Sequence, residues 1–240
     1  MPRGGGAAAP ARGPAAERLG PSIRAGILYE DRQLVVLDKP AGIAAHGGSG
    51  VSAGVIEALR AMSPEQGFEL VHRLDRDTSG CLVIAKDRPT LLELHGAFRE
   101  GAVKKSYDLV VDGRWPRRLR TVRDRLRRYT LPNGERRVRV DVEGLPARTD
   151  FEVVEFAGAC TWLRAFPRTG RTHQIRVHTA ARGHAILGDR KYADRGSAGP
   201  GARRLMLHAS SIAFPLDGQR RRFEAPPDRR FVETWERLRS

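Results

Sequence analysis

Cysteine and lysine are both scarce in this chain of 240 residues. Cys81 and Cys160 each lie inside an apolar run, which favours small buried side chains over a disulfide or a metal ligand. Few basic residues are lysine, so the net charge of +15 comes almost entirely from arginine. Guanidinium groups suit phosphates and stacked bases, which favours a nucleic-acid partner. Arginine usage can also reflect the base composition of a genome, so charge alone does not show that the partner is a nucleic acid.

A secretory signal and a membrane-binding segment are not evident either. Arg3 is followed by Gly-Gly-Gly-Ala-Ala-Ala-Pro, which lacks the leucine-rich core of a signal and is too short and interrupted to span a membrane. No basic amphipathic helix with an aromatic face is evident. We therefore expect a soluble, cytoplasmic protein that does not bind membranes. Residues 1–21, rich in Gly, Ala and Pro, are expected to be a disordered tail, and residues 22–240 to form one domain.

The rest of the chain alternates between short β-rich runs and helical segments, which favours an α+β fold. Gly101 and Gly183 follow two of the expected helices and suit left-handed C-terminal caps. The expected helices span residues 52–62, 90–100 and 172–182. The expected strands span residues 34–38, 81–85, 106–111, 137–142, 150–155 and 161–166.

Arginines are concentrated between Gly113 and Arg139, around Trp115-Pro116, Tyr129 and an Asn133-Gly134 turn. This segment is typical of a basic, partly looped hairpin. It could be a solvated surface hairpin without a specific role. It could also be an electrostatic arm that binds a nucleic-acid backbone and contributes affinity but little sequence choice.

Charged residues are crowded into the string from Val71 to Gly80, directly before an apolar strand. Asp75 lies between Arg73 and Arg76, whose positive charges could hold its carboxylate ionised. An ionised, positioned carboxylate can act as a nucleophile. A turn in which Asp75 or Asp77 only accepts hydrogen bonds from backbone amides fits the local pattern equally well.

Two further strings carry candidate functional residues. In the string from Phe166 to His178, Thr172 is expected to cap a helix with His173, Arg176, Val177 and Ala180 along one stripe. A metal site is disfavoured, because His173 and His178 are five residues apart on different faces and no glutamate is adjacent. Tyr107 follows Lys104-Lys105 in an expected strand. Sheet packing explains it best, and a platform for an unstacked base is the alternative.

Four motifs, in this order and spacing, resemble those of the RluA-type RNA pseudouridine synthases. They are His72-Arg73-Leu74-Asp75 with Thr78-Ser79-Gly80, then Lys105-Ser106-Tyr107, then Arg168 to His178, and then Leu205-Met206-Leu207-His208-Ala209. The resemblance extends from about Ile27 to the C-terminus. Lys39-Pro40-Ala41-Gly42 with His46-Gly47-Gly48-Ser49-Gly50 looks most like the branch that acts on large-subunit ribosomal RNA.

The resemblance implies two related α+β halves that share a long mixed, mostly antiparallel sheet with a central catalytic cleft. Residues 22–240 would then be one catalytic domain that isomerises uridine to pseudouridine without a metal or cofactor. By the family's pattern Asp75 is the nucleophile, Arg176 pairs with its carboxylate, and Tyr107 lies against the target base. Asp77 is a rival nucleophile, but the family nucleophile directly follows Arg-Leu, which favours Asp75.

The same resemblance implies RNA-binding roles around the catalytic group. Arg73 would help to fill the space left by a flipped nucleotide, which suits a planar group that can stack. The other expected RNA-binding residues are His72, Arg76, Lys105, Arg171 and His173. Extruding a base costs a few kcal/mol, so a target in a loop or distorted helix is favoured.

The expected partner is structured RNA, most plausibly 23S-type ribosomal RNA, and a monomer is the default for so cationic a chain. Many relatives in the ribosomal branch carry a small RNA-binding module ahead of the catalytic domain, where this chain has about twenty irregular residues. Transfer RNA is an alternative substrate. A non-catalytic RNA-binding protein of ribosome assembly is a second alternative. A hydrolase with an Asp/His pair is a third, but no Ser or Cys nucleophile elbow is evident.

Overall fold

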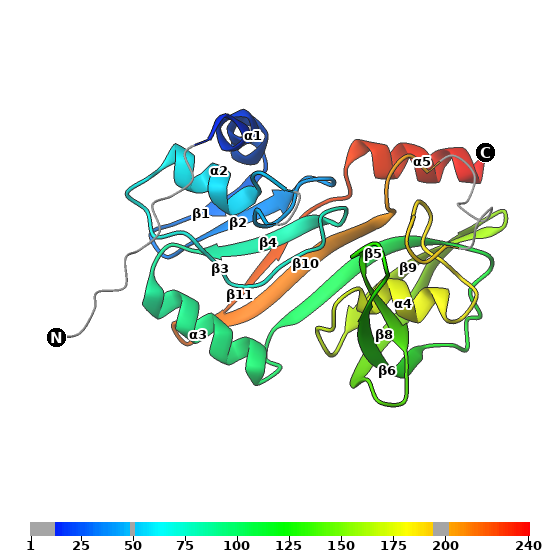
Figure 1. Ribbon diagram of the computed structural model, residues 1–240. Helices are drawn as coiled ribbons and strands as arrows, with labels where there is room; N and C mark the ends of the chain where they lie inside the picture. The colour runs from blue at the N-terminus through cyan, green and yellow to red at the C-terminus, as the bar shows by residue number, and fades with distance from the viewer. Residues whose placement is uncertain (1–12, 49–50, 194–201) are drawn as a thin grey trace.

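The computed structural model describes residues 13–48, 51–193 and 202–240. In this part of the chain, an 11-stranded sheet runs through the whole molecule and five helices pack on it (Figure 1). The helices are α1 Pro14–Ala25, α2 Val55–Met62, α3 Arg88–Arg99, α4 Gln174–Ala180 and α5 Arg229–Arg239. The strands are β1 Ile27–Glu30, β2 Leu34–Lys39, β3 Glu69–Leu70, β4 Ser79–Ala85, β5 Lys104–Asp112, β6 Thr121–Thr130, β7 Arg136–Val140, β8 Leu145–Ala157, β9 Cys160–Pro167, β10 Leu207–Leu216 and β11 Gln219–Glu224.

The sheet consists of two halves that meet at β10. Its strand order is β1-β2-β4-β10-β5-β9-β8-β6-β7, with β3 on β4 and β11 on β10. Neighbouring strands pair antiparallel except β4 and β10, which are parallel and paired only at His208 with Ser79 and Ala209 with Gly80. The seam between the halves is therefore short, and it directly follows the charged loop of residues 72–78.

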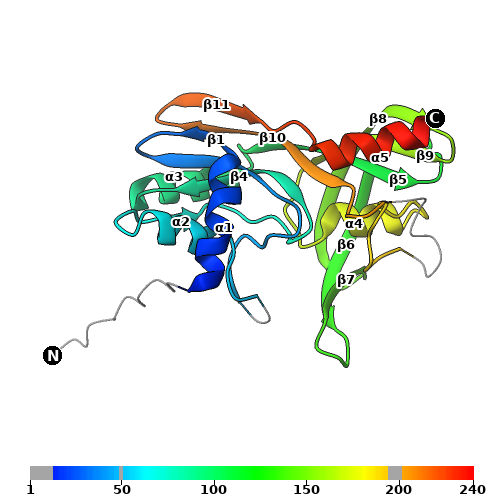
Figure 2. The ribbon, with the colours of Figure 1, turned by 90° about the horizontal axis from the view of Figure 1, so that it is seen from above.

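The N-terminal half has helices on both faces of its strands. Along β2, Leu34 and Val36 pack in a core with α3, whereas Val35 and Leu37 pack in a second core with α1 and α2. A strand buried on both faces is continuously apolar rather than alternating, which explains the run Leu-Val-Val-Leu. Figure 2 shows α1 and α2 together at one side of this half.

The C-terminal half buries aromatic residues on both faces of its strands, and α5 covers one of these faces. Phe231 and Trp235 of α5 contact Trp162 of β9 edge-on, with ring centroids 5.3 and 5.4 Å apart. Trp115 is also fully buried in this core, against Phe151. Cys160 is buried here and Cys81 in the α3 core, and both are free thiols.

The elements predicted from periodicity are present with small shifts of their ends, but two expectations are wrong. Residues 14–21 belong to α1, so the expected disorder is incorrect for them, while residues 1–12 lie outside the described residues. Ile23 and Leu19 pack that helix against α2, and this apolar spacing is masked by the Gly, Ala and Pro around it. Thr172 does not cap α4. The helix begins at Gln174, and its N-cap His173 has left-handed backbone angles (φ 52°).

The expected basic hairpin is present, and it forms part of the main sheet. Trp115 at its start belongs to the core, and β6 and β7 form an antiparallel hairpin that continues the main sheet through β8. The Asn133-Gly134 turn is confirmed: Gly134 is left-handed, and the Glu135 amide donates to Asn133 Oδ1. Within the described residues, no helix has the length and apolar character to cross a membrane.

Gly80 is required where the two halves meet. Its φ is 106°, and a Cβ there would lie 2.3 Å from the carbonyl oxygen of Ala209 on β10. We expect Gly80→Ala to lower the free energy of unfolding by about 2 kcal/mol or more in urea titrations, because both backbone strain and a backbone clash are introduced. Gly134→Ala is the control, with a similar φ and open space around it, and about 1 kcal/mol is expected. Equal losses for the two would contradict a special role of the seam.

Candidate active site

A cavity of about 220 Å³ opens where the two halves meet, and the charged loop before β4 forms one wall. Asp75 lies in this wall with about a quarter of its side chain exposed. The opposite wall comes from β5 and from the segment that leads into α4. Seven of the nine site residues predicted from sequence line the cavity: Arg73, Asp75, Lys105, Tyr107, Arg171, His173 and Arg176.

A buried arginine faces the carboxylate of Asp75. Arg176 of α4 is 4% exposed, and its Nε and Nη2 each donate to Asp189 at 2.8 Å. The remaining Nη1 lies 3.4 Å from Asp75 Oδ2. Burial by itself would lower the pKa of Arg176, but the hydrogen bonds and charge of Asp189, with the charge of Asp75, raise it. The guanidinium is therefore a permanent cation oriented toward Asp75.

Asp189 was not predicted from the sequence, although it fixes that orientation. It is fully buried, and its Oδ1 also accepts the backbone N–H groups of Lys191 and Tyr192. Gly188 precedes it with φ 75°, and a Cβ there would lie 2.0 Å from the Arg204 carbonyl oxygen. A glycine before an acidic residue is too common a pattern to have identified this pair.

His173 lies on the other side of Asp75. Its Nε2 is 3.6 Å from Asp75 Oδ2, and its Nδ1 is 2.6 Å from the hydroxyl of Tyr192. Burial lowers the pKa of His173, although the Asp75 carboxylate opposes this shift. A neutral imidazole beside the carboxylate leaves Arg176 as the main positive charge that Asp75 faces.

Tyr107 forms part of the cavity floor from β5 and packs against both major cores. Burial raises the pKa of its phenol, and the nearby charge of Asp75 raises it further. The hydroxyl is thus protonated at neutral pH and can donate, but cannot act as a base in the resting protein. Its ring remains available to contact a planar group.

Lys39 holds the charged loop from behind. It is fully buried, and its three N–H donors go to the carbonyl oxygens of Pro40 (2.9 Å), Ile43 (2.7 Å) and Arg76 (3.0 Å). Burial lowers the pKa of Lys39 to about 7, against the opposing charges of Asp77 and Asp75. These contacts tie the Lys39-Pro40-Ala41-Gly42 segment to the loop that carries Asp75. Ser49 and Gly50 of the companion motif lie outside the described residues.

We expect Lys39→Met to lower the free energy of unfolding by about 3 kcal/mol, measured by urea unfolding. The change leaves the three carbonyl groups without this donor, and a buried unsatisfied polar group costs about 1–3 kcal/mol. Lys104→Met is the control, because Lys104 is exposed and donates to a single carbonyl oxygen. A loss within 0.5 kcal/mol of that control would show that Lys39 does not hold the loop.

Two predicted site residues do not line the cavity. His72 Nε2 accepts the backbone N–H of Val83 at 3.1 Å, and burial lowers the pKa of His72 to about 3. Arg76 is exposed and donates to the Gly42 carbonyl oxygen at 3.0 Å. Asp77 also lies outside this cavity and lines a larger neighbouring one. Of the two candidate nucleophiles, only Asp75 faces the enclosed site.

Comparison with known proteins agrees with this geometry. Residues 33–181 match the family model described as RNA pseudouridylate synthase. The chain belongs to the RNA pseudouridylate synthase family. These enzymes are isomerases that act on RNA, so RNA is the substrate class of this chain. The predicted α+β fold of two halves around a central site is confirmed.

Several relatives of this synthase are close in sequence. Ribosomal large subunit pseudouridine synthase C of Salmonella typhi is 50% identical over 223 residues, which cover 89% of this chain and 70% of the relative. The protein of the same name from Escherichia coli strain K12 is 48% identical over the same shares of both chains. The solved structure of human RNA Pseudouridylate Synthase Domain Containing 4 has a TM-score of 0.77 at 25% identity. It covers 93% of this chain and 97% of that one.

Proposed function

We propose that this pseudouridine synthase modifies uridines in large-subunit ribosomal RNA. The supporting observation is the identity of about half of all residues, over 89% of the chain, with relatives named for that RNA. Ribosomal RNA as substrate would also agree with the expected cytoplasmic location. We keep a monomer as the expected state, because strong positive charge disfavours self-association.

The proposed chemistry uses Asp75 as the nucleophile. The reaction breaks the bond between ribose C1′ and uracil N1, rotates the base and forms a bond from C1′ to C5. The C5 proton is lost and N1 gains a proton, so the product is an isomer of uridine. Asp75 is positioned for this role because Arg176 Nη1 faces it at 3.4 Å and is itself held from behind by Asp189. A fixed cation balances the charge of the carboxylate and orients it. No step in this scheme needs a metal or a redox cofactor.

Tyr107 is proposed to contact the target base and to donate a hydrogen bond or proton through its hydroxyl. We expect Tyr107→Phe to lower the single-turnover rate by about 10²-fold, the low end for general acid–base catalysis, because the ring stays and the proton is lost. RNA affinity, measured by fluorescence anisotropy, should change by less than about threefold. Tyr29→Phe on β1, which does not line the cavity, is the matched control. An unchanged rate for Tyr107→Phe would reduce Tyr107 to a stacking platform.

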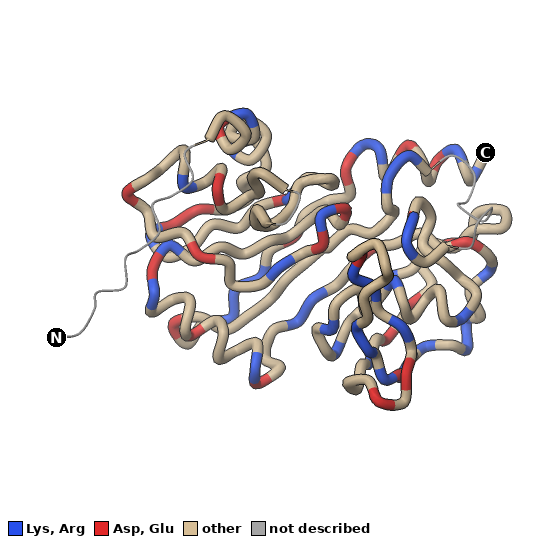
Figure 3. The backbone as a smooth tube through the Cα atoms, viewed as in Figure 1, with Lys and Arg blue, Asp and Glu red and all other residues tan. Residues whose placement is uncertain are grey.

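Basic side chains from both halves surround the site. Arg73, Lys105 and Arg171 line the cavity itself and are proposed to contact the flipped nucleotide or its phosphates. The β6–β7 hairpin belongs to the C-terminal half and is rich in arginine, and its basic positions are blue along the backbone in Figure 3. We propose that the hairpin binds RNA backbone, whereas His72 and Arg76 contribute mainly by supporting the loop.

The test is pseudouridine mapping of ribosomal and transfer RNA from cells with and without the gene. Complementation uses the wild type and Asp75→Asn. Loss of large-subunit sites, restored only by the wild type, is the expected result. Loss of sites only in transfer RNA would show that transfer RNA is the substrate instead. Unchanged maps would favour an RNA-binding protein without turnover.

A further inference from the structure

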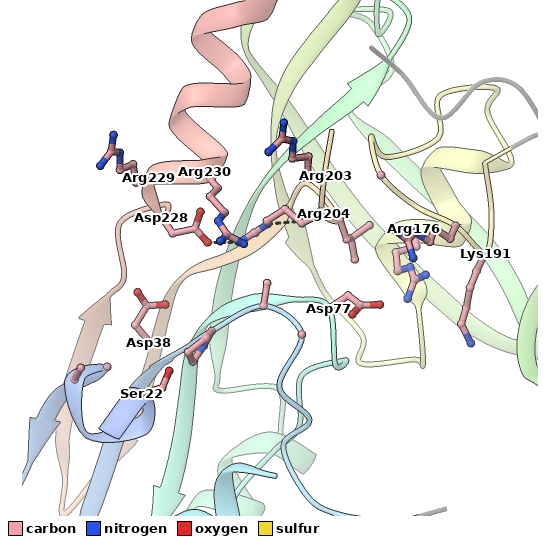
Figure 4. A pocket seen from close by; sticks show the side chains of 18 of the residues that line it. Ser22, Asp38, Asp77, Arg176, Lys191, Arg203, Arg204, Asp228, Arg229 and Arg230 are labelled. Carbon is pink, nitrogen blue, oxygen red and sulfur yellow. Dashed lines mark hydrogen bonds and ion pairs between the residues drawn. The ribbon is translucent and has the colours of Figure 1, made fainter. Parts of the chain in front are cut away.

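A second, larger cavity lies beside the catalytic one. It has a volume of about 900 Å³, and its walls come from α1, the segment after β2, the turn at residues 188–191, and the start of α5. We call it the α5 groove. Figure 4 shows Arg203, Arg229 and Arg230 at one wall, Ser22 and Asp38 at the opposite wall, and Arg176 beyond them. Arg176 borders both cavities, so the groove and the site of Asp75 lie side by side at this residue.

The α5 groove is cationic. Eight arginine or lysine side chains line it, against four carboxylates. Two of those carboxylates are already neutralised by groove cations: Asp228 pairs with Arg204, and Glu135 pairs with Arg137 and Lys191. Burial raises the pKa of a third, Asp38, which weakens its tendency to carry charge. The remaining surface favours an anionic ligand.

Four of the groove arginines are exposed: Arg190, Arg203, Arg229 and Arg230. Arg229 pairs with Glu233 on its own helix, and among the described residues no ion pair involves the other three. Arg229 and Arg230 also open α5, whose first turn contains no acidic residue. Cations are unfavourable at a helix N-terminus because the macrodipole is positive there. The N-cap carboxylate of Asp228 accepts the Phe231 N–H and pairs with Arg204, so it does not pair with Arg229 or Arg230, and an anion bound between these two arginines would be favourable.

The substrate class identifies the anion. The catalytic cavity, at about 220 Å³, is roughly a quarter of the volume of the groove and is suited to a single extruded nucleotide. A polynucleotide must continue beyond the extruded residue, and its next phosphates need a path. The groove begins at Arg176, is wide, and carries guanidinium groups, which match phosphate geometry.

We infer that the α5 groove binds the backbone phosphates of the RNA strand that flanks the target uridine, with Arg203, Arg229 and Arg230 as the contacting side chains. The inference depends on RNA as substrate and deepens the proposed function. It does not depend on which RNA is modified. The groove therefore contributes affinity and direction of the strand, while the catalytic cavity selects the base.

The test compares two triple variants that remove equal charge. R203Q/R229Q/R230Q removes the groove arginines, and R88Q/R99Q/R222Q removes exposed arginines from α3 and β11, away from the groove. Binding is measured by fluorescence anisotropy between 50 and 300 mM salt. The probes are transcripts of large-subunit ribosomal RNA fragments and of transfer RNA. Urea unfolding of both variants establishes that each is folded at the assay temperature.

The groove variant is expected to bind RNA about tenfold or more weakly at low salt. Its slope of log affinity against log salt should fall by about 2, because each lost single-strand phosphate contact removes about 0.7. The groove variant should lose RNA affinity, whereas its rate at saturating RNA should not fall. The control variant should retain the slope of the wild type to within about 0.5.

The outcomes of these measurements test the groove inference separately from the ribosomal RNA proposal. Equal slopes for the two variants would overturn the groove as an RNA path and indicate a solvated face. RNA binding that is unchanged, together with loss of a co-purifying protein, would assign the groove to a protein partner instead. If the wild type modifies only transfer RNA, the ribosomal proposal fails, and the groove is still tested with the transfer RNA transcript.

Discussion

We expect Asp75→Asn to lower the rate of pseudouridine formation at least about a thousandfold while RNA affinity stays within about threefold of the wild type. Asparagine is nearly isosteric but cannot act as the nucleophile, and loss of such a group removes most of the chemical step. The charge on Asp75 is not needed to hold Arg176, because Asp189 already binds two of its nitrogen atoms. Single-turnover kinetics and anisotropy measure the two quantities separately.

Asp77→Asn is the matched control, since it makes the same chemical change two residues along the same loop. Asp77 faces the α5 groove rather than the catalytic cavity, so we expect its rate to stay within tenfold of the wild type. An inactive Asp77→Asn beside an active Asp75→Asn would reverse the assignment of the nucleophile.

The second large effect is expected at Asp189. Asp189→Asn removes the carboxylate from a fully buried pair and leaves the Arg176 cation, at 4% exposure, with only the more distant carboxylate of Asp75 at 3.4 Å. Breaking such a pair from one side costs about 3–5 kcal/mol, a large fraction of the stability of an ordinary domain. Pseudouridine formation should also fall, because Arg176 loses the two contacts that orient it toward Asp75. Urea unfolding and single-turnover kinetics are the measurements.

An exposed ion pair provides the control for that stability effect. Glu224 pairs with Arg222 on β11, and both side chains are about two-thirds exposed. Glu224→Gln is expected to change the free energy of unfolding by less than about 0.5 kcal/mol, because solvent screens the pair. Comparable losses for the two variants would mean that Arg176 does not depend on Asp189 for its charge or position.

Local patterns predicted the elements that have strong periodicity or clear turn chemistry. The β2, β4 and β9 strands are apolar runs, and Gly101 and Gly183 both have the left-handed backbone expected after a helix. The prediction was wrong where tertiary contacts decide. α1 contains Gly20 and an internal Pro21 and is stabilised by packing against α2, and the turn at His173 displaces the start of α4 from Thr172.

The candidate site also divides into features that the sequence predicts and features that depend on tertiary contacts. Its motifs could be recognised along the chain, and the structure brings seven of nine named residues to one cavity. Their partners could not be recognised: Arg176 and Asp75 are 101 residues apart in sequence, and Asp189 belongs to none of the four motifs. The two residues that lie outside the cavity, His72 and Arg76, come from a motif in which position alone does not separate support from contact.

The order of the strands along the chain determines when this enzyme can be assembled during synthesis. Phe214, Leu216 and Ala225 complete the same core as Leu34 and Val83, although they are translated last. Protein domains generally fold as units as the nascent chain emerges. Here the N-terminal half has to wait for β10 and β11, and the seam beside Asp75 closes at the same time. A nascent or truncated chain that lacks β10 and β11 should therefore be inactive and sensitive to proteolysis, so activity would appear only after these strands have been synthesised.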